Sequence, residues 1–488
     1  MKENKEKKEA IYYAGMAVML FLQFIGPYFF KPWAEGITPE GAKITAVFLG
    51  TILGILITND AIPVSFFAMA AMVFHGIFNA AGVVAAAFGS PLVWQITVLY
   101  AFCYFIIRDK TGETLARWIL TRKIAQKSPL IMVMALMFTL GLAGALMGAF
   151  GALFVGLTLL DSICNEAEVD RFSNTARIVY LGCFITICTG AGMLGPMEGL
   201  NVAAASFFES SVGINYIDWK FEVVAVLLIV AECVLLPLVM KAVIRADFSV
   251  FNKVDLNKTI EANSTKLSRL QAIPLIGFVI VAICSLTVGF WPAAGVLANL
   301  KAFNAGIMIT LALGILSIIK IDGKRQYDLM EAFSKGVFWK IVISVAILMA
   351  LGGLMVNNDY GIKQWLTATV GSIINNQNPV IFVAILVIIT IVMTNVFSNS
   401  TTLLVVAALA AALCQPLVDA GYNMGPIVVV LFQASMSAFL THAASGQALI
   451  FLGHDNSSMQ FNWSKGLILY AFYALILIAV TSFFVIVL

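Results

Sequence analysis

The stretch TNVFSNSTT, residues 394–402, puts a dense group of polar side chains inside a long apolar segment. PVIFVAILVIITIVM (379–393) precedes it and LLVVAALAAAL (403–413) follows it. Ser, Thr and Asn also join membrane helices to one another, but such contacts usually need one or two polar residues. Non-helical backbone at membrane depth survives only where protein or an aqueous cavity satisfies its polar groups. The stretch therefore favours a turn of the chain that faces a binding site.

The composition identifies the solvent of this chain as a lipid bilayer. Of its residues 61% are hydrophobic and 11% are charged, and the mean hydropathy is +0.97. A soluble domain with so few charges cannot cover its apolar surface. Apolar runs of about 18 residues or more recur along the chain, and each is long enough as a helix to cross a hydrocarbon core about 30 Å thick. We expect an all-α polytopic membrane protein of the cell (inner or plasma) membrane.

The apolar runs predict about 11 membrane-spanning helices and two re-entrant hairpins, each of which enters and leaves on one face. The hairpins are expected at 129–164 and 379–417. The spans are expected at 12–30, 43–59, 62–85, 88–107, 178–212, 221–243, 272–291, 302–319, 339–357, 425–453 and 465–488.

Lys and Arg residues predict the orientation. With a cytoplasmic N-terminus and an extracytoplasmic C-terminus, almost all of the 29 Lys and Arg residues fall on the cytoplasmic side. This is the distribution that the positive-inside rule favours. The exceptions are Lys31, Lys43, Lys220, Lys301 and Lys363.

The two halves of the chain repeat one order of segments. Trp94 and Trp339 open comparable spans, and amphipathic stretches follow at 110–120 and 359–368. A hairpin and a helix interrupted by small residues come next in each half. An odd number of crossings per half makes the copies inverted, which is typical of secondary transporters. The expected domains are 1–42 (N-terminal tail and first helix), 43–243 (repeat 1, with the broken helix 178–212), 244–271 (cytoplasmic linker) and 272–488 (repeat 2, with the broken helix 425–453 and the last helix).

Three motifs resemble the divalent-anion/sodium symporter family of the ion transporter superfamily, which includes bacterial dicarboxylate and citrate carriers. Ser398-Asn399-Ser400-Thr401 resembles the Ser-Asn-Thr motif at the tip of the second hairpin. SGQALIF (445–451) resembles the second helix break, with Gln447 where the family has Asn, and GPMEGLNVA (195–203) resembles the first break, with Asn201 retained. By this resemblance the chain is a divergent member.

The resemblance implies a homodimer whose scaffold holds two mobile transport domains. Each domain would carry one small organic anion with Na⁺ by an elevator movement. The cation ligands implied are Thr394, Asn399 and Ala443 in the second half, with Gly195 and Glu198 in the first. The substrate-binding residues implied are Ser398, Asn399, Ser400, Thr401, Asn201, His442, Ser445, Gln447, Gly148 and Phe150.

This sequence departs from the family at the first hairpin tip and in both breaks. The first tip reads MGAFG (147–151), without a hydroxyl or amide side chain. Glu198 and His442 put ionisable groups in the breaks, where they can bind a cation, carry a proton or contact the substrate. A literal Ser-Asn-Thr at 173–175 lies among charged residues, and we expect it to cap a helix.

Two further acids fall within apolar runs, and no base is expected near the binding site. Asp161 is expected to cap a helix or reach the membrane surface, and Glu232 to pair with another helix. No Lys or Arg is expected at the membrane midplane. A desolvated carboxylate needs compensation, and bound Na⁺ with neutral oxygen ligands supplies it.

The favoured function is sodium-coupled uptake of a small carboxylate-type anion. The alternative is a proton-coupled symporter or anion exchanger that uses Glu198 and His442. An intramembrane enzyme is disfavoured because the sequence has no HExxH or GxSxG motif. Neither a catalytic residue nor a nucleic-acid partner is expected.

Overall fold

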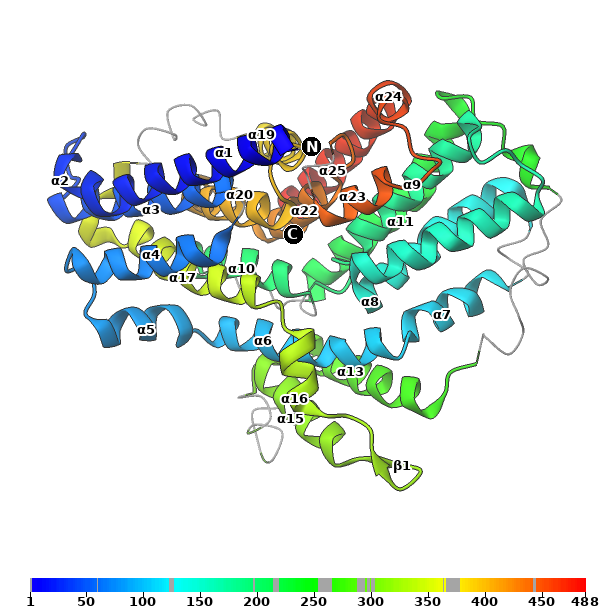
Figure 1. Cartoon of the computed structure of the whole chain (residues 1–488), viewed down its shortest axis with the longest axis horizontal. Helices are drawn as coiled ribbons and strands as arrows, with labels where there is room; N and C mark the ends of the chain where they lie inside the picture. The colour runs from blue at the N-terminus through cyan, green and yellow to red at the C-terminus, as the bar shows by residue number, and fades with distance from the viewer. Residues whose placement is uncertain are drawn as a thin grey trace.

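The computed structural model describes residues 2–58, 60–122, 127–195, 198–213, 219–252, 266–287, 295, 299, 303–362, 364–365, 378–441 and 445–488. Nearly all regular structure in this part of the chain is helical, as expected (Figure 1). The exception is a small antiparallel hairpin of strands β1 (Lys320–Ile321) and β2 (Lys324–Arg325).

The N-terminal part of the chain forms more and shorter helices than the apolar runs predict. The predicted span 62–85 is wrong as a single helix, because the chain turns after Phe74 and a new helix begins at Ala80. Asn79 caps this second helix by accepting a hydrogen bond from the Gly82 amide at 2.6 Å. The elements are α1 (Lys2–Leu20), the π-helix η1 (Phe21–Ile25), α2 (Gly26–Phe29), α3 (Pro39–Thr58), α4 (Ala61–Phe74) and α5 (Ala80–Phe88).

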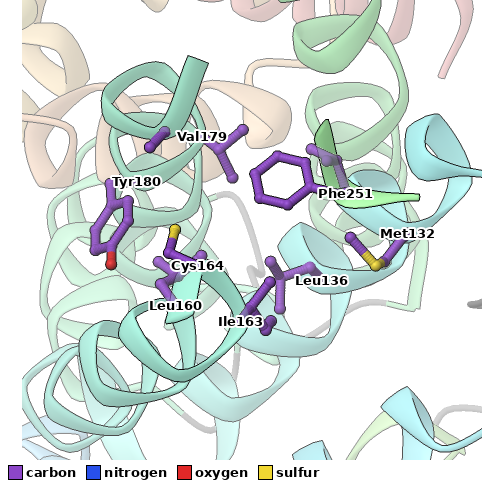
Figure 2. Close-up of a pocket in the computed structure, with 10 residues that line it drawn as sticks. Met132, Leu136, Leu160, Ile163, Cys164, Val179, Tyr180 and Phe251 are labelled. Carbon is purple, nitrogen blue, oxygen red and sulfur yellow. The ribbon is translucent and has the colours of Figure 1, made fainter. Parts of the chain in front are cut away.

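The first predicted hairpin is α8 (Pro129–Glu166), which folds back on itself at Gly148. Gly148 has φ 73° and ψ 158°, a conformation that is open essentially to glycine alone. A Cβ atom at Gly156 would lie 3.5 Å from Leu140 Cδ1, so the two arms run back along each other. Figure 2 shows Met132 and Leu136 of the first arm lining one pocket with Leu160 and Ile163 of the second. Preceding it are α6 (Pro91–Arg108) and the amphipathic α7 (Thr111–Leu120).

The first broken helix follows as α9 (Asn174–Gly190) and α10 (Gly199–Val212). Ser173 caps α9 by accepting from the Ala176 amide at 3.2 Å, which confirms the capping role expected for this motif. A Cβ atom at Gly190 would lie 2.3 Å from the Gly141 carbonyl oxygen, so α9 and the first hairpin touch through their backbones. Small residues permit such contact between membrane helices. The long helix α11 (Trp219–Ala242) comes next.

The middle of the chain contains one long helix that bears on the site, α17 (Trp339–Val356). Of the predicted amphipathic stretch 359–368, the structure describes residues 359–362, 364 and 365. The other elements are η3 (Phe248–Phe251), α13 (Arg269–Thr287), α15 (Ala305–Ile318), α16 (Leu329–Glu331), η6 (Ala332–Gly336) and η7 (Asn358–Tyr360).

The second hairpin and second broken helix also have the predicted interruptions. The hairpin arms are α19 (Pro379–Thr394) and α20 (Asn399–Leu413). As helices they are about 24 and 22 Å long, each short of the roughly 30 Å that a full crossing needs. The broken helix is α22 (Gly425–Met436) followed by α23 (Gly446–Leu452). The chain also forms α21 (Gln415–Asp419), α24 (Met459–Phe461), η8 (Asn462–Gly466) and α25 (Leu467–Val487).

Several helices are long and apolar enough to cross a membrane. Four such helices occur in the described residues, or up to six spans if each of two bent pairs counts as one. Many other apolar helices are shorter than a full crossing, so the total of about 11 spans stays a prediction. The four are Glu9–Phe29, Pro129–Leu146, Lys220–Ala242 and Met459–Val487.

The interrupted elements meet in the middle of the molecule. Helix α10 packs against α20 and α22, and α17 packs against α4, α10 and α20. In Figure 1, α1–α5 lie at one end of the long axis, whereas α8, α9 and α11 lie toward the other. The tip of the second hairpin is therefore placed between these two groups of helices.

Candidate functional site

The tip of the second hairpin brings three oxygen atoms together. Thr394 is fully buried, and its hydroxyl lies 2.9 Å from Asn399 Oδ1 and within hydrogen-bonding distance of the Ser435 carbonyl oxygen. The amide nitrogen of Asn399 points to Met436 Sδ at 3.7 Å, which leaves its oxygen turned toward Thr394. A hydroxyl, an amide oxygen and a carbonyl oxygen are suitable ligands for a hard cation such as Na⁺. The predicted ligand Ala443 lies outside the described residues.

Asn395 joins this tip to the second break. Its Oδ1 accepts from the Leu440 amide at 2.9 Å, and its backbone oxygen accepts from the Thr441 hydroxyl at 2.5 Å. Its amide nitrogen donates to the Tyr470 hydroxyl at 3.0 Å, and that hydroxyl lies 3.1 Å from Ser437 Oγ. The sequence signal for Asn395 is its place in the polar stretch, whereas no sequence pattern marks Tyr470.

The four residues of the tip motif have different surroundings. Ser398 caps α20: its hydroxyl accepts from the Thr401 amide at 3.3 Å and lies 2.6 Å from Thr401 Oγ1. Ser400 and Thr401 line a small cavity between α17 and α20. Ser398 and Asn399 are not among the residues that line this cavity. Its other lining residues are Ile55, Ala61, Lys340, Ile341, Ser344, Leu348, Leu404 and Val405.

The cavity contains a basic residue that the sequence analysis placed elsewhere. Lys340 was expected in a cytoplasmic cluster, away from the site, but it lines the cavity with Ser400 and Thr401. Both helices begin here, since Lys340 lies in the first turn of α17 and Ser400 in the first turn of α20. Helix N-termini carry partial positive charge. The two helix N-termini therefore make this end of the cavity favourable for an anion.

The first break is arranged around two acidic side chains. Glu198 caps α10 by accepting from the Asn201 amide at 2.7 Å, a local structural role that the sequence analysis did not expect. Glu222, in the first turn of α11, accepts from the Gly195 amide at 2.9 Å. Asn201 is fully buried; its amide nitrogen lies 3.4 Å from the Gly192 carbonyl oxygen, and no described residue partners its Oδ1.

The remaining predicted site residues that the structure describes lie in two places, at α23 and at the first hairpin tip. Ser445 caps α23 by accepting from the Ala448 amide at 2.9 Å, and Gln447 is half-buried on the same helix. Gly148 forms the first tip, with open space where a side chain would be. None of these lines the cavity between α17 and α20. His442 and the Phe150 side chain lie outside the described part of the protein.

Asp161, expected to cap a helix or reach the membrane surface, is half-buried and contacts side chains of two other segments. It accepts from the Tyr180 hydroxyl at 2.5 Å and lies 3.2 Å from His454 Nε2. Asp161 belongs to the second arm of α8, whereas His454 lies between α23 and α24. This cluster therefore connects the first hairpin to the segment after the second break. Glu232 accepts from Thr189 of α9, so its predicted pairing with another helix is confirmed.

Three comparisons place the chain among known proteins. The family model described as the sodium:sulfate symporter transmembrane region matches residues 13–488. The chain is 24% identical over 458 residues to dicarboxylate transporter 1, chloroplastic, of Spinacia oleracea, covering 90% of this chain and 75% of that protein. It is 23% identical over 473 residues to the protein of the same name from Arabidopsis thaliana, covering 93% and 79%. The solved structure of Neisseria gonorrhoeae MtrF, described as an antimetabolite efflux pump, superposes with a TM-score of 0.49 at 13% identity, covering 86% and 85%.

Proposed function

The chain belongs to the sodium:sulfate symporter family, and from this premise we propose that it takes up a small carboxylate-type anion together with Na⁺. It is a secondary transporter of anions and not an enzyme. The coupling ion, the substrate class and the direction of transport are parts of the proposal. The dicarboxylate transporters of spinach and Arabidopsis support a carboxylate substrate by their names.

The observation that carries the proposal is the oxygen cluster of Thr394, Asn399 and Ser435. The Thr394 hydroxyl has one proton and two acceptors within reach, so at any moment one of the two oxygens lacks that donor. A cation coordinated by the hydroxyl oxygen and the two acceptors satisfies all three atoms. Na⁺ fits because the ligands are neutral oxygens. For the first half, Gly195 and Glu198 remain the proposed contributors to a cation site.

We place the substrate carboxylate in the cavity between α17 and α20. Ser400 and Thr401 supply hydroxyl donors, and Lys340 supplies positive charge. Burying an unpaired carboxylate costs several kcal/mol, and a nearby cation and two helix N-termini offset part of that penalty. Asn201, Ser445 and Gln447, on α10 and α23, are the further residues proposed to contact the substrate when the site closes.

The proposed transport cycle is an elevator movement within a homodimer. The hairpins, the broken helices and α11 would move as one body against a scaffold that includes α3, α4, α6 and α17. The cavity between α17 and α20 lies at the boundary between these two groups of helices. The proposed orientation has the N-terminus in the cytoplasm and the C-terminus outside, in the cell membrane.

The test is uptake of radiolabelled succinate by liposomes that contain the purified protein. With an inward Na⁺ gradient we expect uptake that disappears when K⁺ replaces Na⁺ on both sides. Binding reciprocity predicts that raising Na⁺ also lowers the succinate concentration for half-maximal uptake. Uptake that ignores Na⁺ but collapses when a protonophore dissipates a proton gradient would instead favour the proton-coupled alternative through Glu198 and His442. Uptake driven only by an internal anion would favour exchange.

A further inference from the structure

A buried acid outside the site described above has no basic partner in the part of the chain that the structure describes. Glu232 lies in the middle of α11 and is fully buried. Its Oε2 lies 2.8 Å from the Thr189 hydroxyl, and its Oε1 has no hydrogen-bond partner among the described residues. An ionised carboxylate in such surroundings is strongly destabilising unless a cation or several donors compensate it.

The helices around Glu232 supply no such cation. Helix α11 packs against α8, α9, α22 and α25, and α8, α22 and α25 contain no Lys or Arg. On α11 itself, Lys220 and Lys241 are about 18 and 13 Å from Glu232 along the helix axis, and Arg177 is similarly far from Thr189 on α9. Arg177 donates to the Asn456 carbonyl oxygen at 3.1 Å.

The remaining ionisable groups around Glu232 are acids or thiols. Tyr473 of α25 lies within electrostatic range of the carboxyl, but its hydroxyl donates to the Gln433 backbone oxygen at 2.8 Å. Cys233 follows Glu232 on α11, and Cys188 lies next to Thr189 on α9. Helix α22 has no ionisable residue. The acids, thiols and phenols farther out along these helices are Asp161, Cys164 and Glu166 of α8, Cys183 and Tyr180 of α9, Glu222 of α11 and Tyr470 of α25.

The hydrogen bonds of Thr189 indicate where a proton belongs. The Thr189 hydroxyl lies 3.0 Å from the Ile185 carbonyl oxygen of its own helix and 2.8 Å from Glu232 Oε2. With a single proton it can donate to only one of these oxygens. If Glu232 is protonated, its O–H donates to Thr189 and the Thr189 proton goes to Ile185. Both short contacts are then hydrogen bonds.

Glu232 also contacts the helix end at the first break, and its helix α11 packs against α22. Thr189 is the last residue but one of α9, directly before the first break. On α22, Gln433 is fully buried three residues before the second break, and neither atom of its side-chain amide has a partner among the described residues. A change in the charge of Glu232 therefore alters its contact with Thr189 at the end of α9.

We propose that Glu232 is a proton-binding site of the carrier, and that its proton crosses the membrane with the anion. The carboxylate takes up one proton on the side of entry and returns it on the side of release, so no other reactant is needed. This inference rests on the proposed function for the anion. It assigns the proton to Glu232, and not to Glu198 or His442.

The test compares wild type with Glu232→Gln in liposomes that contain a pH-sensitive dye. With an inward Na⁺ gradient and external succinate, we expect wild type to acidify the interior as succinate enters. Glu232→Gln should take up succinate with that acidification lost, since Gln imitates the protonated acid in shape. Glu209→Gln, the same change at an exposed acid of α10, should behave as wild type. Succinate entry without acidification in wild type, or equal acidification in Glu232→Gln, would overturn the proposal.

A second readout does not depend on transport. Infrared spectra should show the C=O stretch of a protonated buried carboxyl in wild type and Glu209→Gln but not in Glu232→Gln. Thr189→Val should shift this band, because among the described residues Thr189 is the one hydrogen-bond partner of the carboxyl. If succinate does not enter, the proposed function fails for that probe. The infrared spectra then test by themselves whether Glu232 binds a proton. A band that titrates reversibly with pH supports the site, whereas an absent or unchanging band contradicts it.

Discussion

At the scale of single residues, the site depends on the two ends of one turn. Thr394 ends α19 and Asn399 begins α20, so the turn brings their oxygens to 2.9 Å from each other. The Ser435 carbonyl oxygen completes the group from α22. The three oxygen atoms come from three helices, and the distances between them change if any of these helices moves.

Thr394→Val tests the cation ligand at this scale. Valine keeps the shape but removes the hydroxyl and leaves buried oxygens without a donor, a loss of about 1–3 kcal/mol. We expect the Na⁺ concentration for half-maximal uptake to rise about tenfold, since about 1.4 kcal/mol is a factor of ten. The control is Thr390→Val, one turn earlier, because the Thr390 hydroxyl only donates to the Leu386 carbonyl oxygen at 2.6 Å. Equal effects of the two changes would exclude Thr394 as a ligand.

Lys340→Gln tests the positive charge in the cavity. We expect the succinate concentration for half-maximal uptake to rise several-fold, in keeping with about 1 kcal/mol for a partly exposed charge pair. The effect should shrink at high ionic strength because salt screens the ammonium group, and Lys340→Arg should retain most of the affinity. Lys335→Gln is the control, since Lys335 is exposed and pairs with Glu331 at 3.0 Å. An unchanged dependence on succinate in Lys340→Gln would remove this residue from the site.

At the scale of elements, glycine determines where the first hairpin folds. Two apolar arms joined without a polar tip have no other feature that stops the helix from continuing. Gly148 interrupts the helix, because its backbone has a conformation that other residues avoid. In the second hairpin, polar residues form the turn: Ser398 caps α20, and Asn395 accepts a hydrogen bond from the Leu440 amide in the second break.

Gly148→Ala should therefore destabilise the first hairpin. The change forces a side chain into a disfavoured conformation, which costs about 1–3 kcal/mol. In detergent we expect a lower thermal unfolding temperature and slower uptake. Gly314→Ala serves as the control, because Gly314 is in helix α15 with open space around it, and alanine there should be neutral or stabilising. A Gly148→Ala protein as stable as wild type would show that the arms do not need this turn.

At the scale of the whole molecule, a polar cluster joins the two halves. Asp161 of the first hairpin meets His454 of the second half at 3.2 Å, and Arg171 lies 3.9 Å from Asp161 and 3.8 Å from Asp455. These contacts connect the first hairpin to the segment that follows the second broken helix.

A double-mutant cycle of Asp161→Asn and His454→Gln measures this connection. Residues in direct contact show coupling of about 0.5–3 kcal/mol, whereas distant pairs add within about 0.5 kcal/mol. We expect coupling in that first range in the free energy of unfolding. The reference cycle pairs Asp161→Asn with Lys335→Gln, which lies in another part of the molecule, and should be additive. Additivity in both cycles would indicate that the halves are not joined here.

Much of the element order was predictable because it follows from apolar length and local breaks. Both hairpins and both broken helices have interruptions near the predicted positions, at Gly148, 394–399, 191–198 and 437–445. The span 62–85 failed because its apolar pattern continues through a turn that is marked by Gly76, with φ 69°, and by the Asn79 cap. Of the site residues, Thr394 and Asn399 were predictable from the resemblance, whereas Lys340, Tyr470 and Ser435 come from segments without any shared pattern.

The sequence alone determined the solvent of this protein and the places where its helices stop. Both follow from properties of neighbouring residues, namely apolar length, caps and a glycine that permits an unusual backbone. Only the tertiary structure decided which side chains meet. Lys340 reaches the cavity because α17 packs on α20, and Glu232 is isolated because the helices around it bring no base to its level. Contacts between distant segments depend on helix packing, which no short stretch of sequence encodes.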